Sequence, residues 1–140
     1  PKKGFSALLA NYSDGLKQVL EAIESISAQA PHVVIAHPFA VPGAIIARER
    51  GWVKSVVAAY IAPSNLRSCH DPLTIGDTAV PRWVPMSWRR ALWRFVEKGW
   101  IDPVAVAQLN AVRTPLGLPK VDSFLGHIIE APELSVPLFP

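Results

Sequence analysis

The sequence predicts an α/β fold, a Rossmann-like parallel sheet with flanking helices. Residues 33–36 and 53–59 are continuous apolar runs rich in β-branched residues, which is typical of strands covered on both faces. A helical pattern separates the two runs, and the strands of a strand–helix–strand unit are normally parallel. A third apolar run, at residues 134–139, is expected to be a further strand.

Composition limits the function classes. The 140 residues suit one domain, and with 50% hydrophobic and 18% charged residues the chain is expected to be globular. The net charge of +3 is mildly basic, but no nucleic-acid-binding module accompanies it, so nucleic acid is not an expected partner. No apolar run reaches the roughly 18 residues that span a bilayer, and residues 1–4 do not resemble a signal peptide. We therefore expect a cytoplasmic protein, with peripheral contact at the inner membrane as an open alternative.

The first half of the chain carries clear element signals. Residues 4–29 have the apolar spacing of an amphipathic helix. The strand at 33–36 should end at His37, because Pro38 cannot donate to a sheet ladder. A helix follows from about residue 40, and Arg48, Arg50 and Gly51 supply its cationic last turn and its stop. Residues 60–85 lack periodicity and are expected to form a long loop beside the carboxyl end of the second strand.

The second half predicts three helices and the edge strand. The first helix is expected to run from an N-cap at Ser87 to residue 98, with Gly99 ending it, and its expected buried residues are Trp88, Leu92, Phe95 and Val96. The second should open at Asp102–Pro103 and run to residue 113, and the third should lie within 121–129. Pro137 restricts the strand at 134–139 to a sheet edge.

Three strands make a small sheet for so many helices. We therefore expect residues 1–140 to be a single partial domain, whose first strands lie upstream in a longer protein.

The order and wording of several segments resemble a known family. These segments are VVIAHPFAVPGAIIARERG, SVVAAYIAPSNL, VPMSWRRALWRFVEKGWIDPVAVAQLNAVRTPLGLP and LSVPLFP. They resemble the amino-terminal domain of two-domain, doubly Rossmann-type (GT-B) glycosyltransferases, in particular the bacterial branch with the rhamnosyltransferases of glycolipid synthesis and the sterol and macrolide glycosyltransferases. The resemblance covers nearly the whole chain from about Gly4.

The resemblance implies a function for the parent protein. In this family the amino-terminal domain shapes the acceptor pocket, and a carboxyl-terminal domain holds a nucleoside-diphosphate sugar. A hexosyl group would pass with inversion to the hydroxyl of a hydrophobic acceptor such as a lipid or sterol, while a general base removes the hydroxyl proton. No cofactor or metal is implied. The family's glycine-rich turn, which carries the base, and its nucleotide motif are both missing here, so the chain is expected to form the acceptor side and to be inactive alone.

His37 is the candidate catalytic residue. Plant relatives have an aspartate at the corresponding position, which orients the catalytic histidine. A histidine cannot replace a carboxylate as the anionic partner, so this departure puts the usual dyad in doubt. The imidazole suits either a general base or a contact to the acceptor hydroxyl, because an unperturbed imidazole titrates near neutrality. A turn histidine that caps a backbone group is the simpler alternative.

Four candidate acceptor-binding residues lie just after the predicted strands, and a fifth, Trp83, lies in the predicted long loop. Aromatic walls and a few polar groups are what a pocket for an apolar hydroxyl compound needs. The candidates are Phe39, Ser64, Asn65, Leu66 and Trp83. Packing explains Phe39 and Leu66 equally well. Cys69–His70 has too few neighbouring ligands for a zinc site.

The helix predicted at 87–98 has a basic stripe. Arg90, Arg94 and Lys98 are spaced by four and lie among tryptophans, a pattern that fits docking on an anionic membrane. A solvated helix face, with Trp88 in the core, is the simpler expectation. A non-catalytic binding domain for a lipid or protein partner is accordingly the leading alternative to the glycosyltransferase.

Overall fold

The computed structural model describes residues 11–28, 32–61, 74–75 and 78–138. Its elements, in order, are α2 (Tyr12–Ser27), β1 (His32–Ala36), α3 (Val41–Glu49), β2 (Val53–Tyr60), β3 (Thr74–Ile75), β4 (Thr78–Ala79), α4 (Met86–Val96), the π-helical segment η2 (Glu97–Ile101), α5 (Asp102–Arg113), the 3-10 turn η3 (Thr114–Leu116), α6 (Phe124–Ile129) and β5 (Leu134–Pro137).

The main sheet has three parallel strands in the order β1-β2-β5. Ile35 of β1 aligns with Val57 of β2, and Val57 aligns with Leu134 of β5. This confirms the parallel α/β sheet, the strand–helix–strand unit and the edge position of the strand that contains Pro137. Glu133 fixes the start of β5, because its carboxylate accepts the Val56 amide at 2.7 Å and also pairs with Arg48. The Val56 amide and Arg48 lower the pKa of the Glu133 carboxyl.

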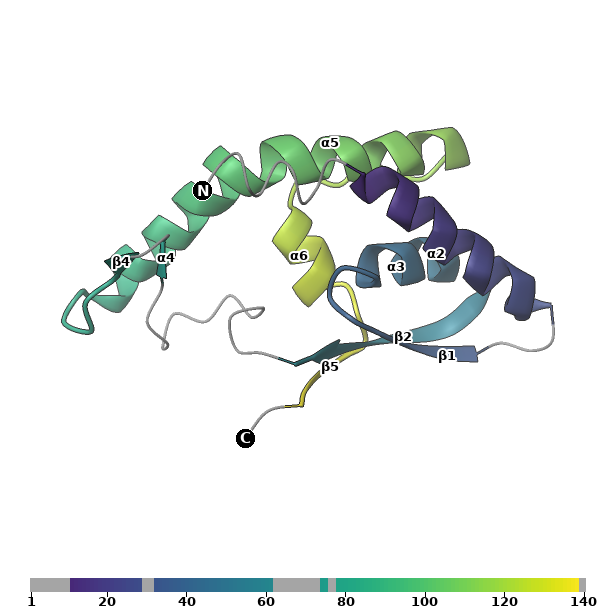
Figure 1. The fold of residues 1–140 in the computed structure, drawn as a ribbon, viewed down its shortest axis with the longest axis horizontal. Helices are drawn as coiled ribbons and strands as arrows, with labels where there is room; N and C mark the ends of the chain where they lie inside the picture. Colours follow the sequence, from purple (N-terminus) through teal and green to yellow (C-terminus); the bar gives the residue numbers. More distant parts are fainter. Residues whose placement is uncertain (1–10, 29–31, 62–73, 76–77, 139–140) are drawn as a thin grey trace.

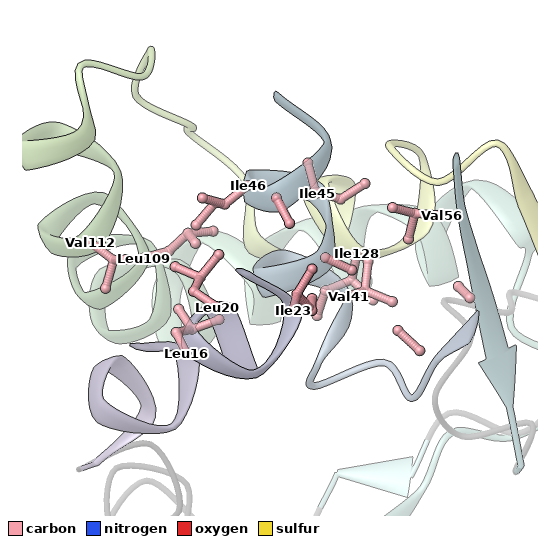
Figure 2. Close-up of a cluster of buried hydrophobic side chains, with 14 of the residues drawn as sticks. Leu16, Leu20, Ile23, Val41, Ile45, Ile46, Val56, Leu109, Val112 and Ile128 are labelled. Carbon is pink, nitrogen blue, oxygen red and sulfur yellow. The ribbon is translucent and has the colours of Figure 1, made fainter. Parts of the chain in front are cut away.

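The hydrophobic core lies between the sheet and the helices on one of its faces (Figure 1). Figure 2 shows that α2, α3, α5, α6 and β2 all contribute side chains to it. The labelled members are Leu16, Leu20, Ile23, Val41, Ile45, Ile46, Val56, Leu109, Val112 and Ile128. Helix α3 is the centre of this core, because every residue from Val41 to Ala47 is buried.

The expectation that the strands are covered on both faces is wrong for the part of the chain that the structure describes. Val33 and Ile35 are 59% and 72% exposed, and Leu134 is 56% exposed. The helices α2, α3 and α6 all lie on the opposite face (Figure 1). The apolar run therefore reflects one buried face and one apolar face that no described element covers.

Of the three helices predicted in the second half, α5 (Asp102–Arg113) confirms its bounds and α6 (Phe124–Ile129) lies within its predicted range, but α4 differs from its prediction. α4 begins at Met86 after Pro85, so Ser87 is inside the helix and does not cap it. Gly99 does not end the helix either, because the wider turn of η2 carries the chain past it into α5. Trp88 and Phe95 were expected in the core but are 72% and 64% exposed. The reason is that α4 packs along η2 and makes no extensive contact with the other described elements.

Other boundaries agree more closely. α2 occupies the described part of the helix predicted at 4–29. Gly51 has a φ of +76°, the left-handed conformation expected of the residue that ends α3. α6 begins after Ser123, whose hydroxyl accepts the Gly126 amide. The short β3–β4 hairpin inside the predicted loop was missed, because two-residue strands leave no periodic signal.

Gly43 allows α3 to approach α2 closely. A Cβ atom at this position would lie 2.8 Å from Cγ1 of Val19, which is stiff about its own χ1 bond. We expect Gly43→Ala to lower the free energy of unfolding by about 1–3 kcal/mol, measured by urea denaturation. Gly15→Ala is the matched control, because a Cβ there meets nothing within 4 Å. The control should be neutral or stabilising, and an equal effect of both variants would contradict the close-packing account.

Candidate functional site

The turn between β1 and α3 lies at the carboxyl edge of the sheet, where open α/β sheets bind ligands. The carbonyl oxygen of His37 accepts the amides of Ala40 at 2.7 Å and Val41 at 3.1 Å. These bonds end the strand and start the helix. The structure thus confirms that His37 stands at the carboxyl end of β1.

The imidazole of His37 is exposed and lies against its own turn. Its Nδ1 accepts the Phe39 amide over a long 3.4 Å, and the two rings stack with centroids 5.8 Å apart. A neutral imidazole that accepts at Nδ1 carries its proton on Nε2. In this tautomer Nε2 is a donor, which suits a contact to a ligand oxygen better than the removal of a proton. His37 therefore makes the backbone contact of a turn histidine, and among the described residues its Nε2 has no partner.

A hydrogen bond from Tyr12, at the start of α2, holds the backbone of Phe39. Its side chain is 42% exposed, and its carbonyl oxygen accepts the Tyr12 hydroxyl at 3.1 Å. The Tyr12 ring packs edge-on against Phe124 at a centroid distance of 5.4 Å, and burial raises the pKa of its hydroxyl. Sequence reasoning treated Tyr12 only as an apolar helix position, because nothing in the local pattern shows that its hydroxyl reaches the turn 27 residues later.

The remaining predicted acceptor residues are not brought to this turn. Ser64, Asn65 and Leu66 lie outside the described residues. Trp83 lies in the turn before α4, where Arg89 donates to the carbonyl oxygens of Pro81, Arg82 and Val84. The structure therefore associates Trp83 with α4 and not with His37 and Phe39.

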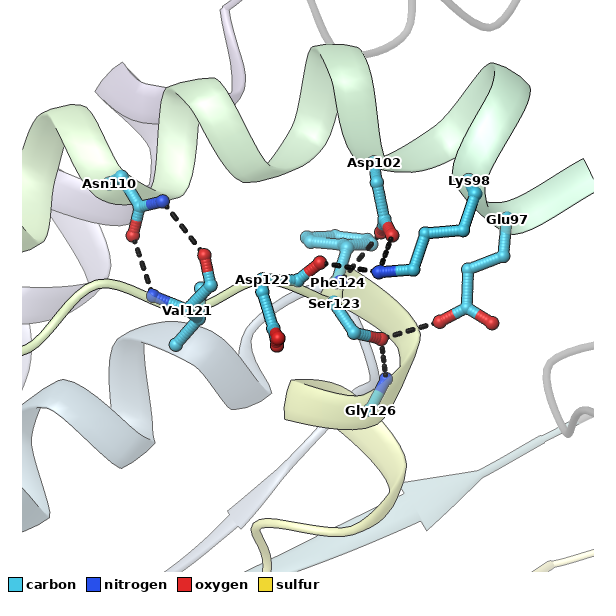
Figure 3. Close-up of polar contacts among 9 residues, drawn as sticks. All are labelled: Glu97, Lys98, Asp102, Asn110, Val121, Asp122, Ser123, Phe124 and Gly126. Carbon is cyan, nitrogen blue, oxygen red and sulfur yellow. Dashed lines mark hydrogen bonds and ion pairs between the residues drawn. The ribbon is translucent and has the colours of Figure 1, made fainter. Parts of the chain in front are cut away.

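A polar cluster joins η2 and α5 to the segment that leads into α6 (Figure 3). Asp102 accepts the Phe124 amide at 2.9 Å and pairs with Lys98, which also donates to the Asp122 carbonyl. Asn110 both donates to and accepts from the backbone of Val121, at 2.9 Å in each direction. Asp102, Lys98 and Asn110 thus each bind a backbone group, which is a structural role.

An ion pair between the buried Arg113 and the partly exposed Glu49 joins α5 to α3. The Arg113 side chain is 1% exposed, and its guanidinium donates to both carboxylate oxygens of Glu49, at 2.7 and 3.0 Å, and to the Pro119 carbonyl. Asn110 and Arg113 both belong to the NAVR segment that carries part of the family resemblance. Their contacts hold the fold together and do not by themselves indicate sugar transfer.

Other candidate sites among the described residues offer less. An open hollow of about 440 Å³ lies over the start of α6, but its Ser123 hydroxyl is already bonded to Glu97 and Gly126. No three His, Cys, Asp or Glu side chains gather as metal ligands in the described ranges, and Cys69–His70 falls outside them. Within the same ranges, no helix is both long and apolar enough to cross a bilayer.

Comparison with known proteins does not identify a family or a function for this site. No protein-family model matches the chain, and no curated protein matches it significantly. The resemblance to glycosyltransferases therefore remains a prediction that rests on the segments quoted above.

Proposed function

We propose that this chain forms the acceptor side of a glycosyltransferase that uses a nucleoside-diphosphate sugar and a hydrophobic hydroxyl acceptor. In this reaction the acceptor oxygen attacks the anomeric carbon and the bond to the diphosphate breaks. The nucleoside diphosphate then leaves, and the hydroxyl proton passes to a base. The donor and that base belong to the part of the protein that the resemblance places outside this chain.

The observation that carries the proposal is the turn at the carboxyl end of β1. An exposed phenyl ring and an imidazole whose Nε2 has no partner among the described residues stand there side by side, at the edge where parallel sheets take their ligands. Phe39 suits the apolar body of the acceptor and His37 its hydroxyl. The apolar face of the sheet that no described element covers also supports a larger domain, because parallel sheets normally carry layers on both faces.

The first test of the function is transfer by the full-length protein. Radiolabelled UDP- and dTDP-hexoses are incubated with hydroxy fatty acids and sterols, and label is followed into the organic phase. We expect transfer that depends on both substrates. If no acceptor is labelled and no donor is hydrolysed, the proposal is contradicted.

Substitution of His37 tests the site within that function. Loss of one hydrogen bond to the acceptor should raise the acceptor KM of His37→Ala about 10-fold, with kcat nearly unchanged. The control His32→Ala, at the other end of β1, should leave both constants unchanged. A fall in kcat of about 100-fold or more would make His37 the general base. No change in either constant would leave it a turn residue.

A non-catalytic binding domain is the second candidate. The exposed indole and phenyl groups of α4 favour it, because aromatic side chains on a surface often mark an interaction site. A protein that binds lipid without turning over any sugar nucleotide would support this candidate over the transferase.

A further inference from the structure

We propose that α4 docks the protein on an anionic phospholipid surface, with its aromatic face in the interface and its arginines at the headgroups. The inference does not rest on the proposed sugar transfer, because it depends only on the surface of α4. The sequence points to the basic stripe that includes Arg90 and Arg94. The proposal adds to it the aromatic face of the same helix.

The apolar side of α4 is a single face. Residues 88, 92 and 95 are spaced by four and three, so their side chains lie along one side of the helix. Trp88 and Phe95 are 72% and 64% exposed, and Leu92 between them is half-buried. α4 packs along η2, so no extensive contact with the other described elements covers this face.

Trp83 adds a second exposed indole next to the helix. It is 82% exposed and follows Arg82 in the turn that Arg89 binds. Arg89 is itself only 6% exposed, so its charge serves to hold this turn on the first part of α4. The turn and the helix therefore present their aromatic side chains from one local unit.

The positive charge of residues 82–96 indicates an anionic partner. Residues 82–96 contain four arginines and no acidic residue. With Arg89 engaged, Arg82, Arg90 and Arg94 remain exposed, and positions 90 and 94 lie roughly a third to a half of a turn around α4 from Trp88. Aromatic residues on one face and arginines on the other are the pattern of helices that lie in an anionic membrane interface.

The position of α4 suits such docking. The carboxyl ends of the three strands of the main sheet point toward one side of the molecule, and α4 lies on that side (Figure 1). A membrane bound by α4 would thus be on the same side as the turn that contains His37 and Phe39. A lipid acceptor would be reached from that side.

Vesicle sedimentation tests the proposal. The full-length protein is spun with vesicles of phosphatidylcholine alone and with vesicles that also contain phosphatidylglycerol. We expect binding to the anionic vesicles, with weak or no binding to the neutral ones. Arg90→Gln combined with Arg94→Gln should weaken binding about 30-fold, because each cation near such a surface contributes about a factor of 5. Trp88→Ser combined with Phe95→Ser should weaken it at least about 10-fold.

Matched controls come from elsewhere on the surface. Ile35→Ser changes an equally exposed apolar residue on the sheet, and Arg50→Gln changes an exposed arginine after α3. Both should bind vesicles like the unchanged protein. Equal binding to neutral vesicles would overturn the proposal, and so would α4 variants that bind as the controls do. It would also be overturned by a dimer that the Trp88 and Phe95 changes dissociate, because the face would then belong to a second copy.

Discussion

Glu49→Ala is expected to lower the free energy of unfolding by about 3–5 kcal/mol, the usual cost of leaving a buried charge without its partner. Arg113 is almost completely buried, and Glu49 is the acid that meets its guanidinium at two points. Without Glu49, the Pro119 carbonyl at 2.8 Å would remain as a hydrogen-bond partner but would carry no compensating charge. A loss of this size is a large part of the stability of an ordinary domain. Urea denaturation at neutral pH measures it.

The chain offers an exposed ion pair for comparison. Lys17 and Asp14 pair at 3.3 Å on α2, with side chains that are 60% and 67% exposed. Asp14→Ala should change stability by less than about 1 kcal/mol, because exposed pairs contribute little. A double variant, Glu49→Leu with Arg113→Met, should recover much of the loss, because no buried charge is left unpaired. If Glu49→Ala were as mild as Asp14→Ala, water would have to reach the guanidinium, and the buried-pair account would be wrong.

The first half of the fold could be predicted because local signals and packing agree there. The apolar run at 33–36 predicts β1, the proline at 38 predicts where that strand ends, and the glycine at 51 predicts where α3 ends. All three agree with the structure to within about a residue. The sequence could not show that the described elements leave one face of β1 exposed. An apolar side chain such as Ile35 looks the same whether it faces a helix or solvent.

α4 could not be oriented from its sequence for a related reason. The spacing of Trp88, Leu92 and Phe95 defines an apolar face, but it does not say whether the protein provides a surface to cover that face. Arg89 is the buried residue of the helix, because its guanidinium finds three backbone carbonyls in the preceding turn. Such a contact depends on the path of the chain before the helix, which periodicity does not encode.

The candidate site could be predicted only at its first turn. His37 and Phe39 follow directly from the strand end, whereas Tyr12 reaches the same turn through tertiary packing. The markers of family resemblance at Asn110 and Arg113 turn out to hold α5 against neighbouring segments. Residues that maintain a fold can thus carry a resemblance without taking part in chemistry.

Folding should weaken as the pH falls from about 6.5 to about 4, because His127 is buried as a neutral imidazole. Its side chain is 9% exposed, and its Nε2 has no hydrogen-bond partner in the described part of the chain. The pKa of His127 is lowered to about 4, mainly by burial and also by the nearby charges of Arg113 and Arg48, while the charge of Glu49 opposes this shift. In the unfolded chain the pKa is about 6.5.

The direction follows from proton uptake. Well above pH 6.5 neither state binds the proton, so the stabilising effect of the neutral form is complete. Between pH 6.5 and 4 the unfolded chain takes up a proton that the folded chain does not, and the free energy of unfolding falls with the pH. The loss should reach about 2–3 kcal/mol between pH 7 and pH 4.5. Below about pH 4 this residue adds no further loss.

A variant without the imidazole isolates the effect. Glu133 has a lowered carboxyl pKa and also destabilises the fold on acidification, so the unchanged protein alone cannot separate the two groups. His127→Leu should lose about 2–3 kcal/mol less than the unchanged protein over the same pH interval, as measured by urea denaturation at each pH. Parallel pH profiles for His127→Leu and the unchanged protein would mean that the imidazole is already charged in the folded state, with water or an anion admitted beside it.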